Sequence, residues 1–371
     1  MSRGILSILL VSLLASVGLF GQAVIDNGEI RVALESYGEI EVFSPATATD
    51  TIFQIDRMSL LTGVSVDAVF DYFEDADNVS APEVVLQPML SDFELRGTFD
   101  NFFSQEPPAV VEKVNIYGWN SGAFVVMKIV VRNAETTAID AIHGFEVLPQ
   151  VDGAYGDETV EYLPAEGVVA MYKAGATHTG YKIFSHAISS INTFEWFSGF
   201  GGSDTLLYNY LSYGAIDTSY TAGVDGAVNV PALPVMTMAP DDSVTIWMGI
   251  AIGADMNTML ANINAAETAY SGLTAIRPVA GALPGSFRLE QNYPNPFNPS
   301  TTIAFSLPRS ETVELVVYNL LGEAVVTLVD ETLEAGAYEY DFRAGNLPSG
   351  VYFYSLKAGE FNQTRRMMLL K

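Results

Sequence analysis

Apolar and polar residues alternate along most of the chain with the period of two that is typical of β-strands. Residues 28–34 and 40–44 both alternate in this way around the turn-prone sequence SYGE, which predicts a hairpin. Residues 108–135 predict two more strands joined by a turn at Gly118–Gly122. Residues 242–253 form an almost continuous apolar run, as in a strand that is buried on both faces. Short strands separated by Gly, Pro and Asn indicate an antiparallel β-sandwich.

One segment has the period of a helix instead. In Asp255–Leu273 apolar residues recur every three or four positions, so we expect one helix that packs at the edge of the sandwich. Prolines and glycines without a period then predict a linker at residues 277–290, after a body of residues 24–276. About seven short strands follow in residues 291–371, which predicts a small immunoglobulin-like sandwich.

The first 23 residues have the pattern of a secretory signal peptide. Arg3 supplies the positive charge, and Ile5–Phe20 is apolar but short for a membrane span. Gly21 and Ala23 are the small residues expected before cleavage at Val24. An uncleaved anchor is the alternative, although no cationic flank follows. We therefore expect a mature chain outside the cytoplasm, without a transmembrane helix.

Composition narrows the possible partners. Hydrophobic residues make up 49% of the chain, enough for a packed core, and the net charge is −27. Residues 24–285 contain 9 Lys and Arg against 34 Asp and Glu, a difference of −25. Such a body repels nucleic acid and anionic membranes and suits cations or neutral sugars, or it is simply an acidic surface that maintains solubility. The absence of cysteine excludes disulfides, thiolate metal sites, a Cys nucleophile and a lipoprotein anchor.

Four motifs occur in order near the C-terminus. They are NYPNPFNPSTTI (Asn292–Ile303), VYNLLGE (Val317–Glu323), LPSGVYFY (Leu347–Tyr354) and RRMMLLK (Arg365–Lys371). With them, residues 291–371 resemble the type A C-terminal sorting domain of the type IX secretion system of Bacteroidetes and related Gram-negative bacteria. The sorting-signal positions that carry the resemblance are Asn292, Pro294, Asn295, Pro296, Phe297, Asn298, Pro299, Gly350, Arg365, Arg366 and Lys371.

The resemblance implies an immunoglobulin-like fold and two partners, the type IX secretion translocon and its sorting peptidase. It also implies that the domain is usually removed and that the body is released or attached to the cell surface. The prolines have a physical role beside this, because each fixes φ and favours extended geometry in the residue before it. We expect Pro294, Pro296 and Pro299 to form an irregular edge that cannot pair with a further strand. Asn295 and Asn298 are expected to cap the turns of this edge.

Motifs for enzymatic chemistry are missing from the body. HExxH, GxSxG, the phosphate-binding GxxxxGK[ST] and the dinucleotide-binding GxGxxG do not occur. The three histidines, His143, His178 and His186, lack the spacing of metal ligands. A pair of carboxylates could serve glycoside hydrolysis, but an acidic body offers many accidental pairs.

Two acidic stretches, Phe70–Glu83 and Pro149–Tyr162, could bind calcium, which takes six to eight oxygen ligands. The second is favoured because its glycines allow the chain to fold around an ion. The candidate ligands are Asp152, Asp157 and Glu158, and the alternative is a loop of solvated acids.

Large aromatic residues gather in Asn192–Asp204, before a glycine-rich loop. Trp196 and Phe197 could stack on a sugar ring, with Glu195 and Asp204 accepting hydrogen bonds from its hydroxyl groups. The alternative is a strand that lines the core, and residues 99–108 are a weaker case of the same kind. The sequence therefore favours a secreted or cell-surface, non-enzymatic protein that binds glycans or other extracellular material. A secreted polysaccharide hydrolase and a structural surface component are the alternatives.

Overall fold

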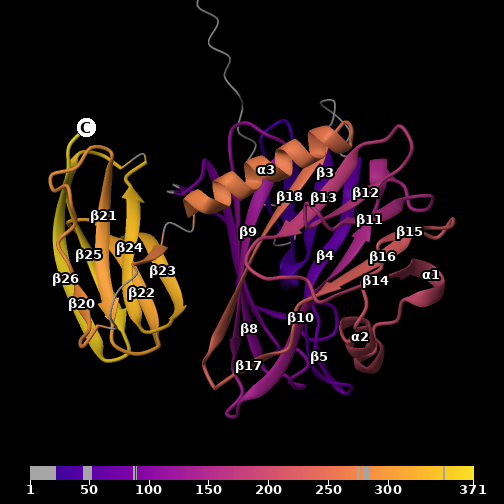
Figure 1. Ribbon diagram of the computed structural model, residues 1–371, viewed down its shortest axis with the longest axis horizontal. Helices are drawn as coiled ribbons and strands as arrows, with labels where there is room; N and C mark the ends of the chain where they lie inside the picture. The colour runs from indigo at the N-terminus through magenta and orange to yellow at the C-terminus, as the bar shows by residue number, and fades with distance from the viewer. Residues whose placement is uncertain are drawn as a thin grey trace, which may run out of the picture.

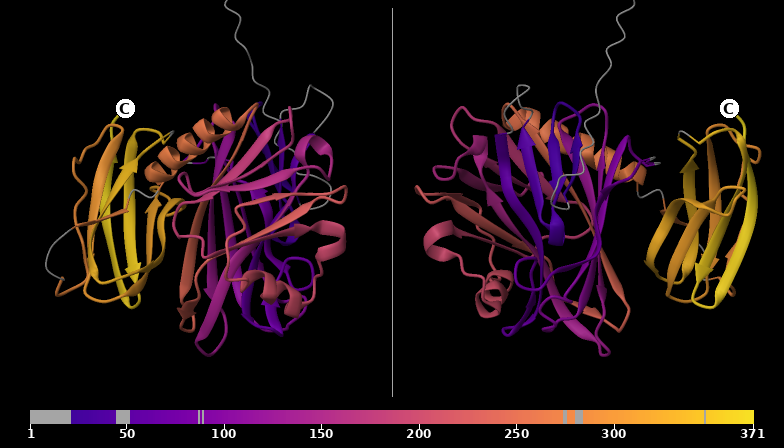
Figure 2. Two further views of the ribbon diagram at one scale, coloured as in Figure 1. Left: turned by 45° about the vertical axis from the view of Figure 1, so that its right-hand side comes forward. Right: turned by 180° about the vertical axis from the view of Figure 1, so that it is seen from behind.

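The computed structural model describes residues 22–44, 52–86, 88, 90–273, 276–279, 284–345 and 347–371. Within them the chain forms two antiparallel β-sandwiches that lie side by side, the larger body first and the smaller C-terminal domain second (Figures 1 and 2). The predicted mostly-β fold is confirmed. The predicted signal peptide lies outside the described residues except for Gln22 and Ala23, and the first strand already begins at Ala23.

Nine strands form each sheet of the body among the described residues. Sheet A runs in the order β1 (Ala23–Asp26), β2 (Arg31–Leu34), β3 (Ile40–Ser44), β4 (Ile52–Ser65), β10 (Ile139–Pro149), β16 (Ala227–Ala232) and β14 (Ser190–Glu195), with β5 (Ala68–Phe70) on β4 and β17 (Met236–Met238) on β10. Sheet B runs in the order β15 (Ser219–Thr221), β11 (Thr159–Leu163), β12 (Val168–Tyr172), β13 (His178–Ile183), β18 (Ser243–Gly253), β9 (Phe124–Asn133), β8 (Val110–Gly118), β7 (Phe93–Asp100) and β6 (Asp77–Val84).

The core of the body lies between these sheets and follows from the alternation in the sequence. The predicted hairpin is β2–β3, with Leu34 opposite Ile40 across the 3-10 turn η1 (Ser36–Gly38). The second predicted hairpin is β8–β9. The strand β18 is buried on both faces as predicted, because Ile246, Met248 and their alternate neighbours enter the core while Trp247 faces outward.

The outward side of β18 explains the position of α3 (Met256–Leu273). This helix was predicted at the edge of the sandwich, but it lies across the outer face of sheet B, over β18, β9 and β13 (Figure 1). Glycines let its backbone approach: a Cβ on Gly180 would be 2.4 Å from Sδ of Met259, and one on Gly253 would be 2.3 Å from the amide nitrogen of Met259. The buried residues Met259 and Ile263 then form a second apolar layer with Trp247.

Two shorter helices cover the outer face of sheet A. They are α1 (Trp196–Gly199) and α2 (Asp204–Leu211), which follow β14. Leu207 and Leu211 of α2 are buried against Leu61 of β4 and Val230 of β16. The remaining short element, the 3-10 turn η2 (Val151–Gly153), ends β10. No helix in the described part of the chain is both long and apolar enough to cross a membrane.

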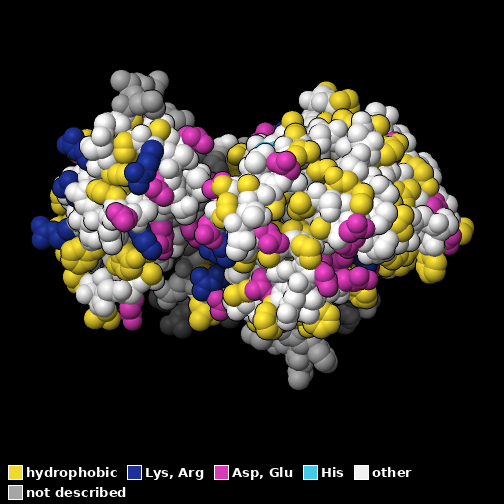
Figure 3. All heavy atoms as spheres, turned by 90° about the horizontal axis from the view of Figure 1, so that it is seen from below, with side chains coloured by type: hydrophobic (Ala, Val, Ile, Leu, Met, Phe, Trp, Pro, Cys, Tyr) yellow, Lys and Arg dark blue, Asp and Glu magenta, His cyan; other side chains and the backbone are white. Residues whose placement is uncertain are grey.

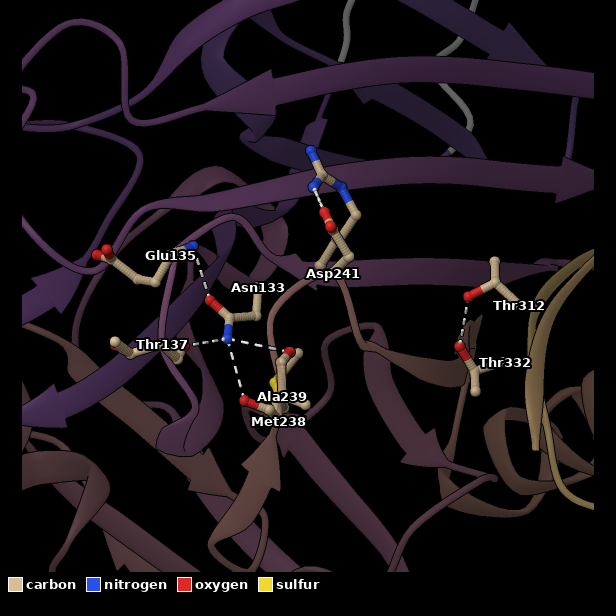
Figure 4. Close-up of polar contacts among 9 residues, drawn as sticks. Asn133, Glu135, Thr137, Met238, Ala239, Asp241, Thr312 and Thr332 are labelled. Atoms are coloured by element: carbon tan, nitrogen blue, oxygen red, sulfur yellow. Dashed lines mark hydrogen bonds and ion pairs between the residues drawn. The ribbon is translucent and has the colours of Figure 1, made fainter. Parts of the chain in front are cut away.

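Asn133, at the end of β9, ties two loops together below the sheets (Figure 4). Its side-chain amide donates to the carbonyl oxygens of Thr137 (3.0 Å), Met238 (3.0 Å) and Ala239 (3.1 Å). Its side-chain oxygen accepts a 2.8 Å hydrogen bond from the amide of Glu135. The side chain is fully buried, and its hydrogen bond to the carbonyl of Met238 is buried too. The carbonyl of Ala239 has a second partner, the amide of Asp242 at 3.0 Å.

Asn133→Ala is therefore expected to lower the free energy of unfolding by about 1–3 kcal/mol, because it leaves buried polar groups without partners. Chemical denaturation of the purified protein measures this loss. The matched control is Asn120→Ala, since Asn120 is exposed in the β8–β9 turn. Equal stability of the two variants would contradict the role given to Asn133.

The C-terminal domain consists of two four-stranded sheets with one shared core in the described residues. Sheet C has the order β19 (Ile276–Val279), β24 (Gly336–Arg343), β21 (Ser300–Leu307) and β20 (Arg288–Leu289), and sheet D has the order β23 (Ala324–Leu333), β22 (Glu311–Tyr318), β25 (Gly350–Ala358) and β26 (Phe361–Leu369). The segment predicted as a linker thus contributes β19 and β20, both of which pair with strands of this domain.

The proline-rich segment closes the core of this domain. The ring of Phe297 is buried, and its backbone exchanges hydrogen bonds with the carbonyl of Met368 and the amide of Leu370. Asn295 was predicted to cap a local turn, yet its side-chain oxygen accepts a 2.9 Å hydrogen bond from the amide of Met368. Asn292 is buried and donates to Thr301 at 2.9 Å. The segment therefore joins both ends of the domain, and its role as an edge that cannot accept a further strand stays a prediction.

Candidate functional site

A β-bulge in β4 turns two successive charged residues toward the outer face of sheet A. Leu148 of β10 pairs with Arg57 and Pro149 pairs with Ile55, so Asp56 is the extra residue. The pairing of β3 with β4 shifts at the same place. A bulge re-aims side chains in this way and is common next to functional sites.

Arg57 is the centre of what we name the Arg57 cluster, a group of side chains from β4, β10, α1 and the segment after β5. Its guanidinium forms an ion pair with Glu146 and lies 4.7 Å from the ring centroid of Trp196. It also lies 5.7 Å from the ring of Tyr72 and 5.8 Å from that of Phe200. Aromatic rings attract a cation on their faces, most strongly where water is excluded.

This cluster is largely withdrawn from water. The side chain of Arg57 is 14% exposed and that of Glu146 is 4% exposed. Within the described chain, the buried Nε of Arg57 has no hydrogen-bond partner. A buried donor without a partner is rare in proteins and costs free energy, so it asks for an explanation such as a bound polar group.

Glu39, the residue before β3, is close enough to the guanidinium to interact with it, and Glu41 of β3 is close to Glu39. Burial raises the pKa of Glu39 to about 7, although the charge of Arg57 opposes the shift. Burial also raises the pKa of Glu41 to about 8, and the nearby carboxylates of Glu35 and Glu39 add to it. Near neutral pH Glu41 therefore mostly holds its proton and Glu39 holds one about half of the time, so both can donate hydrogen bonds as well as accept them. Asp56 forms a hydrogen bond with Tyr155, whose pKa burial raises to about 12.

The structure brings one of the four predicted ligand-binding residues into this cluster. Trp196 is half-buried, with Arg57 on its ring and Phe200 at 4.7 Å between centroids. Phe197, the next residue of α1, is 79% exposed. Trp196 is thus neither the free surface ring nor the fully buried core residue that the sequence offered as alternatives.

The two predicted acids hold loops in place. Glu195 accepts hydrogen bonds from the hydroxyl of Tyr220 (3.0 Å) and the amides of Gly223 (3.0 Å) and Asp225 (3.3 Å), and the amide of Gly223 contributes most to lowering the pKa of Glu195. Asp204 accepts a 3.3 Å hydrogen bond from the amide of Val69. Both carboxylates therefore position α1 and α2, and their contact with a ligand stays a prediction.

The predicted calcium ligands have separate protein partners. Asp152 accepts from the side chain of Gln54 at 2.8 Å and from the amide of Thr177 at 3.2 Å. Glu158 is fully buried and accepts a 2.6 Å hydrogen bond from the amide of Ala227, while Asp157 is exposed. Across the described ranges no three His, Asp or Glu side chains are grouped so that they could hold a metal ion. Calcium binding at these residues stays a prediction.

Sequence reasoning missed Arg57, Glu146, Glu39 and Glu41. The available signal was the pair Asp56–Arg57 within the otherwise alternating stretch of β4, since two successive charges break a period of two. The positions of Glu146 and Glu39 beside that pair depend on the pairing of strands that are distant in the sequence.

The comparison with known protein families identifies the C-terminal domain. Residues 291–370 match the family model described as secretion system C-terminal sorting domain. The protein is therefore a substrate of the type IX secretion machinery, which exports it to the cell surface or the medium. No curated protein matches the chain in sequence.

Solved structures similar to this chain have low sequence identity with it. A bacterial glucoamylase complexed with acarbose has 8% identity over 68% of this chain and 36% of its own length, with a TM-score of 0.49. A galactose mutarotase-like protein from Lactobacillus casei ATCC 334 has 10% identity over 62% of this chain and 100% of its own, with a TM-score of 0.39. This chain spans about a third of the glucoamylase. At such low similarity the likeness says nothing about activity.

Proposed function

We propose that the exported body binds carbohydrate at the Arg57 cluster. The observation that carries this proposal is the Arg57 guanidinium, which is 14% exposed beside Glu146 and the ring of Trp196, with the exposed ring of Phe197 following in α1. Sugar hydroxyls both donate and accept hydrogen bonds, so they match a site that contains a guanidinium and the carboxyl groups of Glu39 and Glu41, whose raised pKa values let them donate as well as accept.

The aromatic residues support the same class of ligand. The exposed ring of Phe197 offers apolar area beside the polar groups, and Trp196 forms the adjoining wall. Aromatic side chains provide such area at a low cost in conformational entropy. The glycine-rich segment Gly199–Gly202 begins at the last residue of α1, and the hydroxyl of Tyr210 holds it by accepting from the amide of Gly201 at 3.2 Å and donating to the carbonyl of Gly199 at 2.8 Å. Without side chains, these glycines leave room for a ligand near the backbone.

A hydrolase is the second candidate, and one observation favours it. Glycoside hydrolysis needs one carboxyl group that retains its proton near neutral pH and a second that is ionised. Glu39 and Glu41 have raised pKa values that suit the protonated role. Burial also raises the pKa of Glu146, although Arg57 opposes that shift, so the ionised role depends on their ion pair. Sugar release that disappears in Glu39→Gln, with binding retained, would support the hydrolase over simple binding.

Phe197→Ala is expected to weaken glycan binding by about tenfold without changing the melting temperature, because an exposed ring contributes to a contact and little to folding. A glycan array on the purified protein selects the ligand, and titration then measures its dissociation constant. Tyr293→Ala is the matched control, since it removes an equally exposed ring, 82%, from the sorting domain. If Phe197→Ala and this control bind the glycan with the same dissociation constant, Phe197 of α1 is not part of the binding site.

A further inference from the structure

A cavity of about 830 Å³ separates the body from the sorting domain. Its body wall is the outer face of sheet B beside the C-terminal end of α3, formed by β6 to β9, by β18 and by Tyr270 and Leu273 of α3. Its opposite wall is β23 and β24 of the sorting domain. Figure 3 shows basic and acidic side chains together where the two lobes meet.

The body wall combines basic groups with aromatic rings. Arg96, Lys113 and Lys128 line the cavity, although residues 24–285 contain only 9 Lys and Arg in total. Nζ of Lys128 lies 5.5 Å from the ring centroid of Trp247, which stacks on Tyr117 at 6.0 Å. Both rings are almost buried, at 8% and 5% exposed, so they support the ammonium group of Lys128 at the cavity wall. We name this basic part of the wall the shelf.

The sorting domain places acidic side chains opposite this shelf. Nζ of Lys113 lies 3.1 Å from Oδ2 of Asp330. Burial lowers the pKa of Lys128, and the carboxylates of Glu331 and Asp330 oppose that shift. Burial likewise raises the pKa of Glu331, and Lys128 opposes the change. The two walls are therefore complementary in charge within a space that excludes part of the solvent.

The local charge of the shelf differs from that of the whole body. The body is strongly acidic, but charges beyond about 8 Å are largely screened at physiological ionic strength. On the body wall, the acids nearest these three basic residues are Glu83, which forms a 2.6 Å ion pair with Arg96, and Glu94, which accepts a 2.9 Å hydrogen bond from Asn115. Three basic against two acidic residues leave this wall with a net charge of +1, and among the described residues Lys113 and Lys128 form no ion pair with a body carboxylate. Apart from the acids of the sorting domain, this wall therefore favours an anion.

We propose that this face of sheet B is a binding site for an anionic saccharide, a chain of uronic acid or sulfated sugars, and that Asp330 and Glu331 of the sorting domain occupy the place of its charged groups. The sorting domain then competes with the ligand in the full-length chain. Lys113 and Lys128 bind the acidic groups of the saccharide, and the ring of Trp247 holds Lys128 in position. This site shares no residue with the Arg57 cluster, so either proposal can fail alone.

The test measures binding of the full-length chain to polygalacturonate, with neutral dextran as the comparison polymer. The double variant Asp330→Asn/Glu331→Gln is expected to bind polygalacturonate about threefold to tenfold more tightly than the natural chain at low salt, because two competing anions are removed. Adding Lys128→Gln to this variant should reverse the gain. Rising salt should weaken binding, as screening requires.

Matched controls separate the site from net charge. Glu323→Gln/Glu360→Gln removes the same two charges from exposed turns of the sorting domain outside the cavity, and Lys182→Gln removes one positive charge outside it. If these controls change binding as much as the cavity variants do, or if dextran binds equally well, the proposal is wrong. Unchanged binding by the double variant also overturns it. Melting curves verify folding, and Lys113→Gln replaces Lys128→Gln should the latter unfold.

Discussion

Removal of residues 291–371 is expected to leave the body folded and to stop its delivery to the cell surface. The two domains have separate cores, because no buried side chain of the sorting-domain core belongs to the apolar clusters of the body. Truncation leaves β19 without its partner β24. Because β19 belongs to neither sheet A nor sheet B, both sheets of the body keep all their strands. The truncated chain should therefore accumulate in the periplasm with the melting behaviour of a folded domain.

Cell fractionation and protease treatment of intact cells measure the location. The complementary experiment attaches residues 274–371 to an unrelated periplasmic reporter, which should then reach the surface. This fusion includes β19 and β20, so both sheets of the sorting domain are complete. Surface delivery of the truncated chain would show that the body contains a second export signal.

Arg57→Met is expected to lower the free energy of unfolding by about 3–5 kcal/mol near pH 8, the typical loss when one partner of a buried ion pair is removed. The remaining carboxylate of Glu146 is 4% exposed and would be left without a cation. Arg57→Met also removes the cation from the rings of Trp196 and Tyr72. Chemical denaturation measures the change.

The loss should depend on pH in a defined direction. Burial already raises the pKa of Glu146, and Arg57 opposes that shift, so the variant raises the folded-state pKa further. A raised folded-state pKa means that the folded protein holds a proton more tightly than the unfolded chain does. The destabilisation is then smallest below the unfolded pKa, about 4.3, and grows as the pH rises through the folded-state pKa.

Two further variants check the assignment. Arg57→Met/Glu146→Gln should recover much of the loss, because no unpaired charge remains in the site. Arg96→Met removes an ion pair with Glu83 whose side chains are 58% and 57% exposed, and it should cost less than about 1 kcal/mol. A loss in Arg57→Met that is the same at pH 4.5 and pH 8 would contradict an unpaired Glu146 as its cause.

Local patterns predicted most strands because successive side chains of a strand point to opposite faces, so the burial of each face is visible as alternation in the sequence. Tyr338, Tyr340 and Phe342 alternate in the sequence, and all three are buried in β24. The doubly buried β18 was likewise visible as an apolar run. The helix α3 was visible too, but its place on the face of sheet B was not, because that place depends on Gly180, about 75 residues earlier in the chain.

The candidate sites were harder to predict from the sequence than the strands were, because their residues come together only in the tertiary structure. The aromatic stretch pointed to Trp196, whereas the guanidinium against it comes from a bulge in β4 that only the pairing with β3 and β10 defines. The predicted calcium ligands are close in sequence, yet Asp152 and Glu158 have different hydrogen-bond partners in the fold.

The sequence by itself determined the export route, the mostly-β class and the acidity of the body, because each is a property of local pattern or composition. Only the tertiary structure decided which charges meet. Lys113 and Asp330 are separated by more than two hundred residues, and their 3.1 Å contact exists because the sorting domain lies against sheet B. The net charge is a sum over the whole chain, whereas a bound ligand interacts mainly with the few charges within a screening length of it. Which charges lie that close to each other is determined by the folded structure.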